Sequence, residues 1–236
     1  MLKEELVKRS PVRVLEKTIH GGVGKGNLGV ITARKGVGKT ACLAHLAIDT
    51  LLRDGKVLHI SFADDPHHVE SWYRHIFDEL ADSYKLENAF DVFENVIPNR
   101  LIIHFKQLDI TFDQIRSHIQ QVEGGIGFRP DMIIVDGRDF EVMTEETLSG
   151  WKEFAANQDA AAWFAAVLHR HNLQLDEKGI PAPVNRLSDL FSVIIMLEPR
   201  PDYIEMKLLK DHDNTASDKL HLKLDPRTLL ICNHRV

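Results

Sequence analysis

Two glycines, a lysine and a threonine lie close together in the segment Ala33-Arg-Lys-Gly-Val-Gly-Lys-Thr40. Such glycines allow the backbone to turn so that successive N–H groups point at phosphate oxygens. Lys39 could reach the outer phosphates of a nucleotide, and the Thr40 hydroxyl could ligate Mg²⁺. The segment fits the phosphate-loop pattern, with alanine in place of its usual first glycine. The residues that we expect to bind the nucleotide are consecutive: Arg34, Lys35, Gly36, Val37, Gly38, Lys39, Thr40 and Ala41.

Aspartates follow two apolar runs elsewhere in the chain. Asp136 comes directly after Met-Ile-Ile-Val and would hold Mg²⁺ through a water molecule. The run Ile60-Ser-Phe-Ala leads to Asp64 and Asp65. A carboxylate here could polarise the water that attacks a phosphate, or it could simply cap a helix that begins at Pro66. The two roles can be divided, with Asp64 as the base and Asp65 as the cap.

The elements that must position these residues alternate along the chain. Apolar runs predict strands over 28–33, 56–62, 100–105, 131–136 and 162–168, and helical spacing predicts helices over 39–53, 66–84 and 145–157 and from 112 onward. We expect Gly124-Gly125 to end the helix that begins at 112. This alternation implies an α/β protein with a central, mostly parallel sheet flanked by helices, in which ligands bind at the carboxyl ends of the strands.

The rhythm changes after Asn185. Four strand-like runs over 192–197, 203–209, 219–224 and 228–232 are separated by short turns. They predict a C-terminal antiparallel β-meander that closes one edge of the sheet.

Two other patterns suggest different chemistry. Residues 24–29 match a dinucleotide fingerprint but precede a strand instead of following it, so we do not expect nicotinamide or flavin binding there. His67-His68 and His169-x-His171 invite a transition-metal interpretation. Thirteen histidines make chance pairs easy, so solvated loop residues are the better interpretation.

This layout resembles the RecA/KaiC/DnaB family of P-loop ATPases over roughly residues 10–232, and it is closest to single-domain KaiC-like ATPases. The segment Gly21-Gly-Val-Gly-Lys-Gly-Asn-Leu-Gly29 resembles the glycine-pair entry of KaiC- and RadA-type proteins. Phe62-Ala-Asp-Asp-Pro66 lies where KaiC-like domains read Phe-Glu-Glu-x-Pro. The resemblance implies a RecA-like fold, ATP and Mg²⁺ as ligands, and Asp64 in the place of the catalytic glutamate.

The resemblance also implies roles for three residues near strand ends. His169 follows the fifth strand, where family members often carry a polar sensor of the γ-phosphate; it could equally be an ordinary strand-end histidine. Lys210-Asp-His212 lies where KaiC-like proteins carry Lys-x-Arg, which reaches into the site of a neighbouring subunit. Here His212 replaces the arginine, and histidine is uncharged for much of the time. The family usually forms hexameric rings, so we expect a homo-oligomer.

Length and composition limit the possibilities further. The chain has 236 residues, a net charge of −6 and 44% hydrophobic residues, which suits one RecA-like domain over 1–236. We expect an N-terminal extension over 1–20, a nucleotide-binding core over 28–198 and β-hairpins over 199–236. The longest apolar run, Ala160 to Leu168, is far below the roughly 20 residues that span a bilayer. Two cysteines and a charged amino terminus without a signal-peptide core suggest a cytoplasmic protein without membrane contact.

Three functions are compatible with these observations. The first is a slow, Mg²⁺-dependent, KaiC-like ATPase that acts through assembly or a protein partner. The second is a DNA-dependent recombinase or DnaB-like helicase motor. The third is a nucleotide-binding scaffold with little or no hydrolysis. Residues 138–160, in a region that contacts DNA in such motors, hold two basic residues against six acidic ones, which disfavours binding to nucleic acid.

Overall fold

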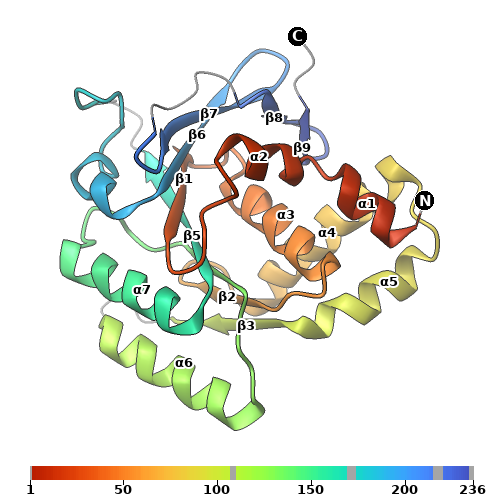
Figure 1. Cartoon of the computed structure of the whole chain (residues 1–236), viewed down its shortest axis with the longest axis horizontal. Coiled ribbons are helices and arrows are strands. Elements are labelled where there is room, and N and C mark those ends of the chain that lie inside the picture. The colour runs from red at the N-terminus through yellow and green to blue at the C-terminus, as the bar shows by residue number, and fades with distance from the viewer. Residues whose placement is uncertain (1, 107–109, 169–173, 215–219, 234–236) are drawn as a thin grey trace.

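The computed structural model describes residues 2–106, 110–168, 174–214 and 220–233. Within them, a nine-stranded sheet has the order β3-β2-β4-β5-β1-β6-β7-β8-β9 (Figure 1). The strands are β1 Leu28–Arg34, β2 Val57–Ser61, β3 Arg100–His104, β4 Met132–Asp136, β5 Ala161–Leu168, β6 Val193–Pro199, β7 Ile204–Asp211, β8 Leu222–Leu224 and β9 Ile231–Asn233. The pairs from β3 to β6 are parallel and those from β6 to β9 are antiparallel. The α/β, RecA-like fold with a C-terminal antiparallel meander is therefore confirmed.

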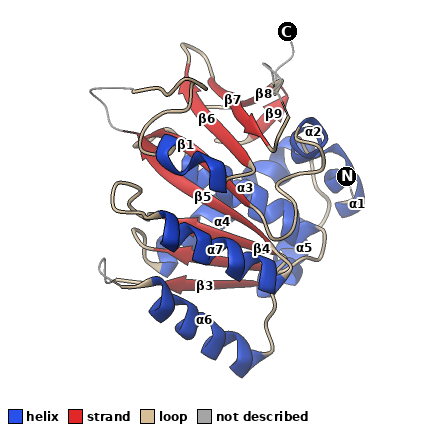
Figure 2. Cartoon of the chain, turned by 60° about the vertical axis from the view of Figure 1, so that its left-hand side comes forward, coloured by secondary structure: helices blue, strands red, loops and turns tan. Residues whose placement is uncertain are grey.

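Helices cover both faces of this sheet (Figure 2). They are α1 Lys3–Arg9, α2 Val12–Thr18, α3 Lys39–Leu52, α4 Pro66–Tyr84, α5 Ala89–Val96, α6 Phe112–Ile126 and α7 Glu145–Gln158, with short 3₁₀ helices η1 Ile97–Asn99 and η2 Asn185–Leu190. One hydrophobic core joins the sheet to α1–α5, and the other joins it to α6, α7 and η2. The sheet is thus the middle of three layers, as expected for a parallel sheet whose strands are apolar on both faces. None of the helices in the described residues is long and apolar enough to cross a membrane.

Strand β1 occupies the middle of the sheet because it is apolar on both faces. Its first six residues are buried, and β5 and β6 pair with it in parallel on either side. β5 also separates β1 from β4, while β4 pairs with β2. The carboxyl ends of β1, β2 and β4 therefore meet at one edge of the sheet, where the sequence predicted the ligand site.

The meander folds back over the loop that follows β1. A methyl group added to Gly38 would lie 2.6 Å from Cδ2 of Leu224, the last residue of β8. The backbone N–H of Ile231 in β9 donates to Nδ1 of His45 on α3 at 3.0 Å. The C-terminal strands therefore support the first turns of α3 as well as extending the sheet.

The prediction that Gly124-Gly125 ends α6 is wrong. The helix continues through both glycines to Ile126 and stops at Gly127, whose φ is +64°. Glycine inside a helix costs about 1 kcal/mol relative to alanine, which weakens the helix without forbidding it. Only the left-handed backbone at Gly127 interrupts the hydrogen-bond ladder.

Candidate nucleotide site

The phosphate loop connects β1 to α3 through two left-handed glycines. Gly36 has a φ of +78° and Gly38 a φ of +108°. Glycine tolerates this conformation because it carries no Cβ. Gly38 is also the N-cap of α3, so the loop ends where the unpaired amides and the positive end of the helix dipole begin.

Lys39 is held across this loop. Its Nζ donates to the carbonyl oxygens of Ala33 at 3.3 Å and Arg34 at 3.2 Å, and the residue is buried. Burial lowers the pKa of the Lys39 ammonium, while the nearby charge of Asp136 opposes that shift. The ammonium therefore lies within the loop with weak carbonyl partners that phosphate oxygens could replace.

The Thr40 hydroxyl and the Asp136 carboxylate meet although they are 96 residues apart in sequence. Thr40 Oγ1 donates to Asp136 Oδ2 at 2.7 Å. Asp136 is buried at the end of β4; burial raises its pKa, the Thr40 hydrogen bond opposes the shift, and the charge of Asp64 adds to it. A hydroxyl and a carboxylate are oxygen ligands of the kind that Mg²⁺ prefers, so this pair fits the ion.

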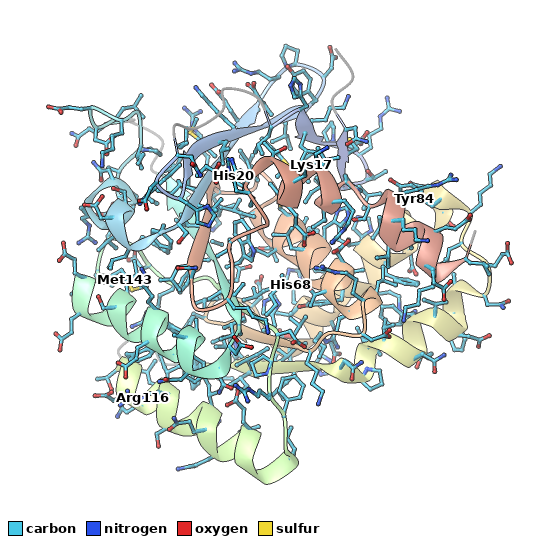
Figure 3. The ribbon with its side chains drawn as sticks, in the orientation of Figure 1. Lys17, His20, His68, Tyr84, Arg116 and Met143 are labelled. Atoms are coloured by element: carbon cyan, nitrogen blue, oxygen red, sulfur yellow. The ribbon has the colours of Figure 1, made fainter. Side chains whose placement is uncertain are left out.

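Asp64 and Asp65 have different surroundings. The Asp65 carboxylate accepts the backbone N–H of His68 at 3.0 Å and caps α4, which confirms its predicted capping role. His68 is labelled in Figure 3, in the first turn of that helix. Asp64 caps nothing of this helix in the described contacts; its Oδ1 lies 3.9 Å from Nε2 of His68, and its side chain is 36% exposed. A half-exposed carboxylate near Asp136 suits the base, and its catalytic role stays a prediction.

Two residues that the sequence analysis did not single out shape this end of β2. The Ser61 hydroxyl donates to the Asp64 carbonyl at 2.6 Å and accepts the Asp64 N–H at 3.0 Å. Gly137, directly after Asp136, has a φ of +82° and lies against Ala63. A glycine after the strand-end aspartate was the available signal, but its significance depends on β2 and β4 being neighbours.

The predicted trans-acting residues lie apart from the phosphate loop. Lys210 Nζ donates to the Ser188 carbonyl at 2.8 Å, and burial lowers its pKa. His212 Nδ1 lies 2.9 Å from Asp211 Oδ1, and its Nε2 lies 3.3 Å from the Val23 carbonyl. Asp211 pairs with the first residue of β6, so this group is at the amino-terminal edge of the sheet. His169, the predicted γ-phosphate sensor, and His171 lie outside the described residues.

The glycine segment before β1 forms part of a separate cavity. Gly21 to Lys25, helix α2 and Trp163 line about 380 Å³ at the amino-terminal edge, with no residue of the phosphate loop among the lining residues. The segment precedes β1, whereas a dinucleotide-binding glycine turn follows a strand and leads into a helix, so its position does not suit a dinucleotide. The side chain of His67 is 95% exposed, and the described residues contain no group of three or more potential metal ligands.

One comparison with known proteins gives a match. A family model described as an AAA domain (AAA_25) matches residues 3–169, well over half of the chain. The match includes the phosphate loop, Asp64 and Asp136, and it begins early enough to include α1 and α2. No curated protein matches the chain.

Proposed function

Because the chain belongs to the family of AAA domains, which are P-loop nucleotide-binding proteins of the ATPase type, we propose that it is a slow, Mg²⁺-dependent ATP hydrolase of the KaiC-like class. The observation that carries this proposal is the hydrogen bond between Thr40 and Asp136. It joins the phosphate loop to the acidic end of β4, which is where an ion between the loop and the phosphates would bind.

Each group of the site has a role in this reaction. The amides at Gly36–Thr40 and the Lys39 ammonium bind the phosphates and offset the negative charge that develops on them. Thr40 and Asp136 would hold Mg²⁺, which would supply positive charge to offset the negative charge of the phosphates. Asp64 orients a water molecule and draws on its proton as the water attacks the γ-phosphate.

Measuring the turnover of Mg-ATP by three variants tests this assignment. Lys39→Ala should abolish turnover, and Asp64→Asn should reduce kcat roughly hundredfold because a general base typically contributes 10²–10⁴-fold. Asp65→Asn is the matched control, since asparagine caps a helix about as well as aspartate and activity should persist.

Two outcomes would contradict the assignment. Turnover by Asp64→Asn at the parental rate would remove the catalytic role of Asp64. A parent that binds ATP but hydrolyses it no faster than Lys39→Ala would leave a nucleotide-binding scaffold instead of an enzyme.

We further propose that the nucleotide state acts on assembly or on a protein partner, and not on DNA. The phosphate edge, at the carboxyl ends of β1, β2 and β4, has two arginines nearby that bind backbone carbonyls. Arg138 donates to the Ile110 carbonyl at 3.2 Å, and Arg186 donates to the Glu141 carbonyl at 2.8 Å. The acidic residues of 138–160 dominate the remaining charge, so a DNA phosphate backbone would be repelled. A trans role for Lys210 and His212 would require both to leave contacts within their own chain.

A further inference from the structure

The ends of β2 and β4 approach each other too closely for two ordinary residues. A methyl group added to Gly137 would lie 2.6 Å from both the backbone nitrogen and the Cβ of Ala63. One residue earlier on each strand, the Phe62 N–H donates to the Asp136 carbonyl at 2.9 Å. Glycine at 137 is therefore required twice, by this contact and by its left-handed backbone.

The direction of the chain after this contact is also fixed. Ser61 is buried at the end of β2, and its single hydroxyl binds both the N–H and the carbonyl of Asp64. The main chain of Asp64 is thus held from two sides, by Ser61 within its own turn and by Gly137 through the neighbouring Ala63.

Aspartate has the shortest carboxylate side chain, so the position of its carboxylate follows closely from the position of its backbone. A catalytic group displaced by about 1 Å can cost roughly a hundredfold in rate. The spacing between the two strand ends is therefore a direct control on how far Asp64 reaches.

We propose that Gly137 is a positioning residue for Asp64: it sets the spacing of β2 and β4 that suits an aspartate as the water-orienting group, and the Ser61 hydroxyl fixes the direction of that aspartate. This inference rests on the proposed function, since Asp64 must act on the attacking water.

A double-mutant cycle tests the spacing, with kcat and KM measured for Mg-ATP in the parent, Gly137→Ala, Asp64→Glu and the double variant. Gly137→Ala should lower kcat roughly ten- to hundredfold with little change in KM, because the strand ends separate and Asp64 retracts. Asp64→Glu should lower kcat in the parent, where its side chain is too long. In the Gly137→Ala background, Asp64→Glu should raise kcat, because the extra methylene brings the carboxylate back to the attacking water. A change of the same sign and size in both backgrounds would overturn the proposal.

Gly127→Ala is the matched control for backbone strain. Gly127 also has a positive φ, of +64°, but a methyl group there would meet nothing within 4 Å. This variant should lose stability and keep the parental kcat. An equal loss of kcat in Gly127→Ala would assign the effect to lost stability and overturn the proposal.

Ser61→Ala keeps the proposal testable if Gly137→Ala does not fold. It should lower kcat about tenfold at unchanged ATP affinity, and Ser61→Thr, which retains the hydroxyl, should keep most of the activity. Parental kcat in Ser61→Ala would overturn the proposal.

Failure of hydrolysis itself is a distinguishable outcome. If the parent binds ATP without turnover above Lys39→Ala, crystal structures of the parent and Gly137→Ala give the answer instead. A wider separation of the Asp64 and Asp136 carboxylates in the variant supports the positioning role, and an unchanged separation overturns it.

Discussion

The hydrogen bond between Thr40 and Asp136 combines two functions in one pair of side chains. In the free protein it satisfies a buried carboxylate, and in the nucleotide complex the same two side chains are the candidates for holding Mg²⁺, Asp136 through a water molecule. Removing the hydroxyl should therefore affect both stability and metal-dependent binding.

Thr40→Val keeps the shape of the side chain and removes only its hydroxyl. We expect it to lower the free energy of unfolding by about 1–3 kcal/mol, because Asp136 loses its hydrogen-bond donor in a buried site. It should also weaken ATP binding in the presence of Mg²⁺ more than in its absence. Denaturant unfolding and nucleotide titrations at two Mg²⁺ concentrations measure both effects.

Thr40→Ser is the matched control, since it keeps the hydroxyl and loses one methyl group. It should bind Mg-ATP nearly as the parent does. Equal weakening by serine and valine would argue that the methyl contact matters and the hydroxyl does not.

At the residue scale, the sequence was informative where a residue type has one physical purpose. The left-handed glycines and Lys39 of the phosphate loop belong to this class, because few other residues could take those backbone angles or carry that charge. Ser61 and Gly137 could not be recognised. Their significance comes from the adjacency of β2 and β4, which local spacing does not determine.

At the scale of elements, the packing of α6 against α7 contains a buried acid. Gln158 Nε2 on α7 donates to Glu123 Oε2 on α6 at 2.6 Å, while Oε1 of Glu123 has no hydrogen-bond partner among the described residues. Burial raises the pKa of Glu123 to about 6, and the bond from Gln158 opposes the shift. The folded state is therefore more stable when the Glu123 carboxyl between these two helices is protonated.

Glu123→Gln should make the protein more stable than the parent at neutral pH. The folded state holds a proton on Glu123 up to about pH 6, while the unfolded chain releases it near its ordinary pKa of 4.5. Parental stability should thus fall as the pH rises from about 4.5 to 6, and the variant should not share this loss. The expected gain at pH 7 is about 1 kcal/mol after allowance for solvent screening.

Urea unfolding from pH 4.5 to 8 measures this difference. Glu153→Gln, a change of the same type at an exposed position on α7, is the control; it retains Glu123 and should follow the parental stability curve. A stability difference between Glu123→Gln and the parent that does not vary with pH would contradict the assignment.

The strands were predictable and several helices were not, for physical reasons. Each strand of the parallel sheet is a short apolar run bounded by polar residues, which the sequence displays directly. Helices α1 and α2 have seven residues each, too few to establish a periodic pattern, and they depend on packing against the rest of the core. The end of α6 was predicted wrongly. The two glycines at 124 and 125 only lower the helix propensity, whereas the left-handed backbone at Gly127 ends the helix.

At the scale of the whole molecule, we expect Mg-ATP to promote assembly. Light scattering should show an increase in mass when the parent is mixed with Mg-ATP, with Lys39→Ala remaining at its starting mass. We expect this because, in the assembly that we propose, the acidic phosphate edge of one copy of the protein faces the next copy and the bound nucleotide forms part of the interface. An unchanged mass for the parent at saturating nucleotide would leave a protein partner as the route of action.

The position of β1 between β5 and β6 has a consequence for synthesis of the chain on the ribosome. The phosphate loop is translated well before the segments that complete it, since its strand gains both neighbours only after residue 193 has been made. Leu224 must then be made before its side chain can cover Gly38. Ile231 must be made before its N–H can donate to His45 Nδ1. The loop of the nucleotide site is thus translated long before the site is completed. Until β6 has been released from the exit tunnel, one side of the apolar strand β1 stays unpaired in the nascent chain, and such an exposed strand edge is prone to aggregation.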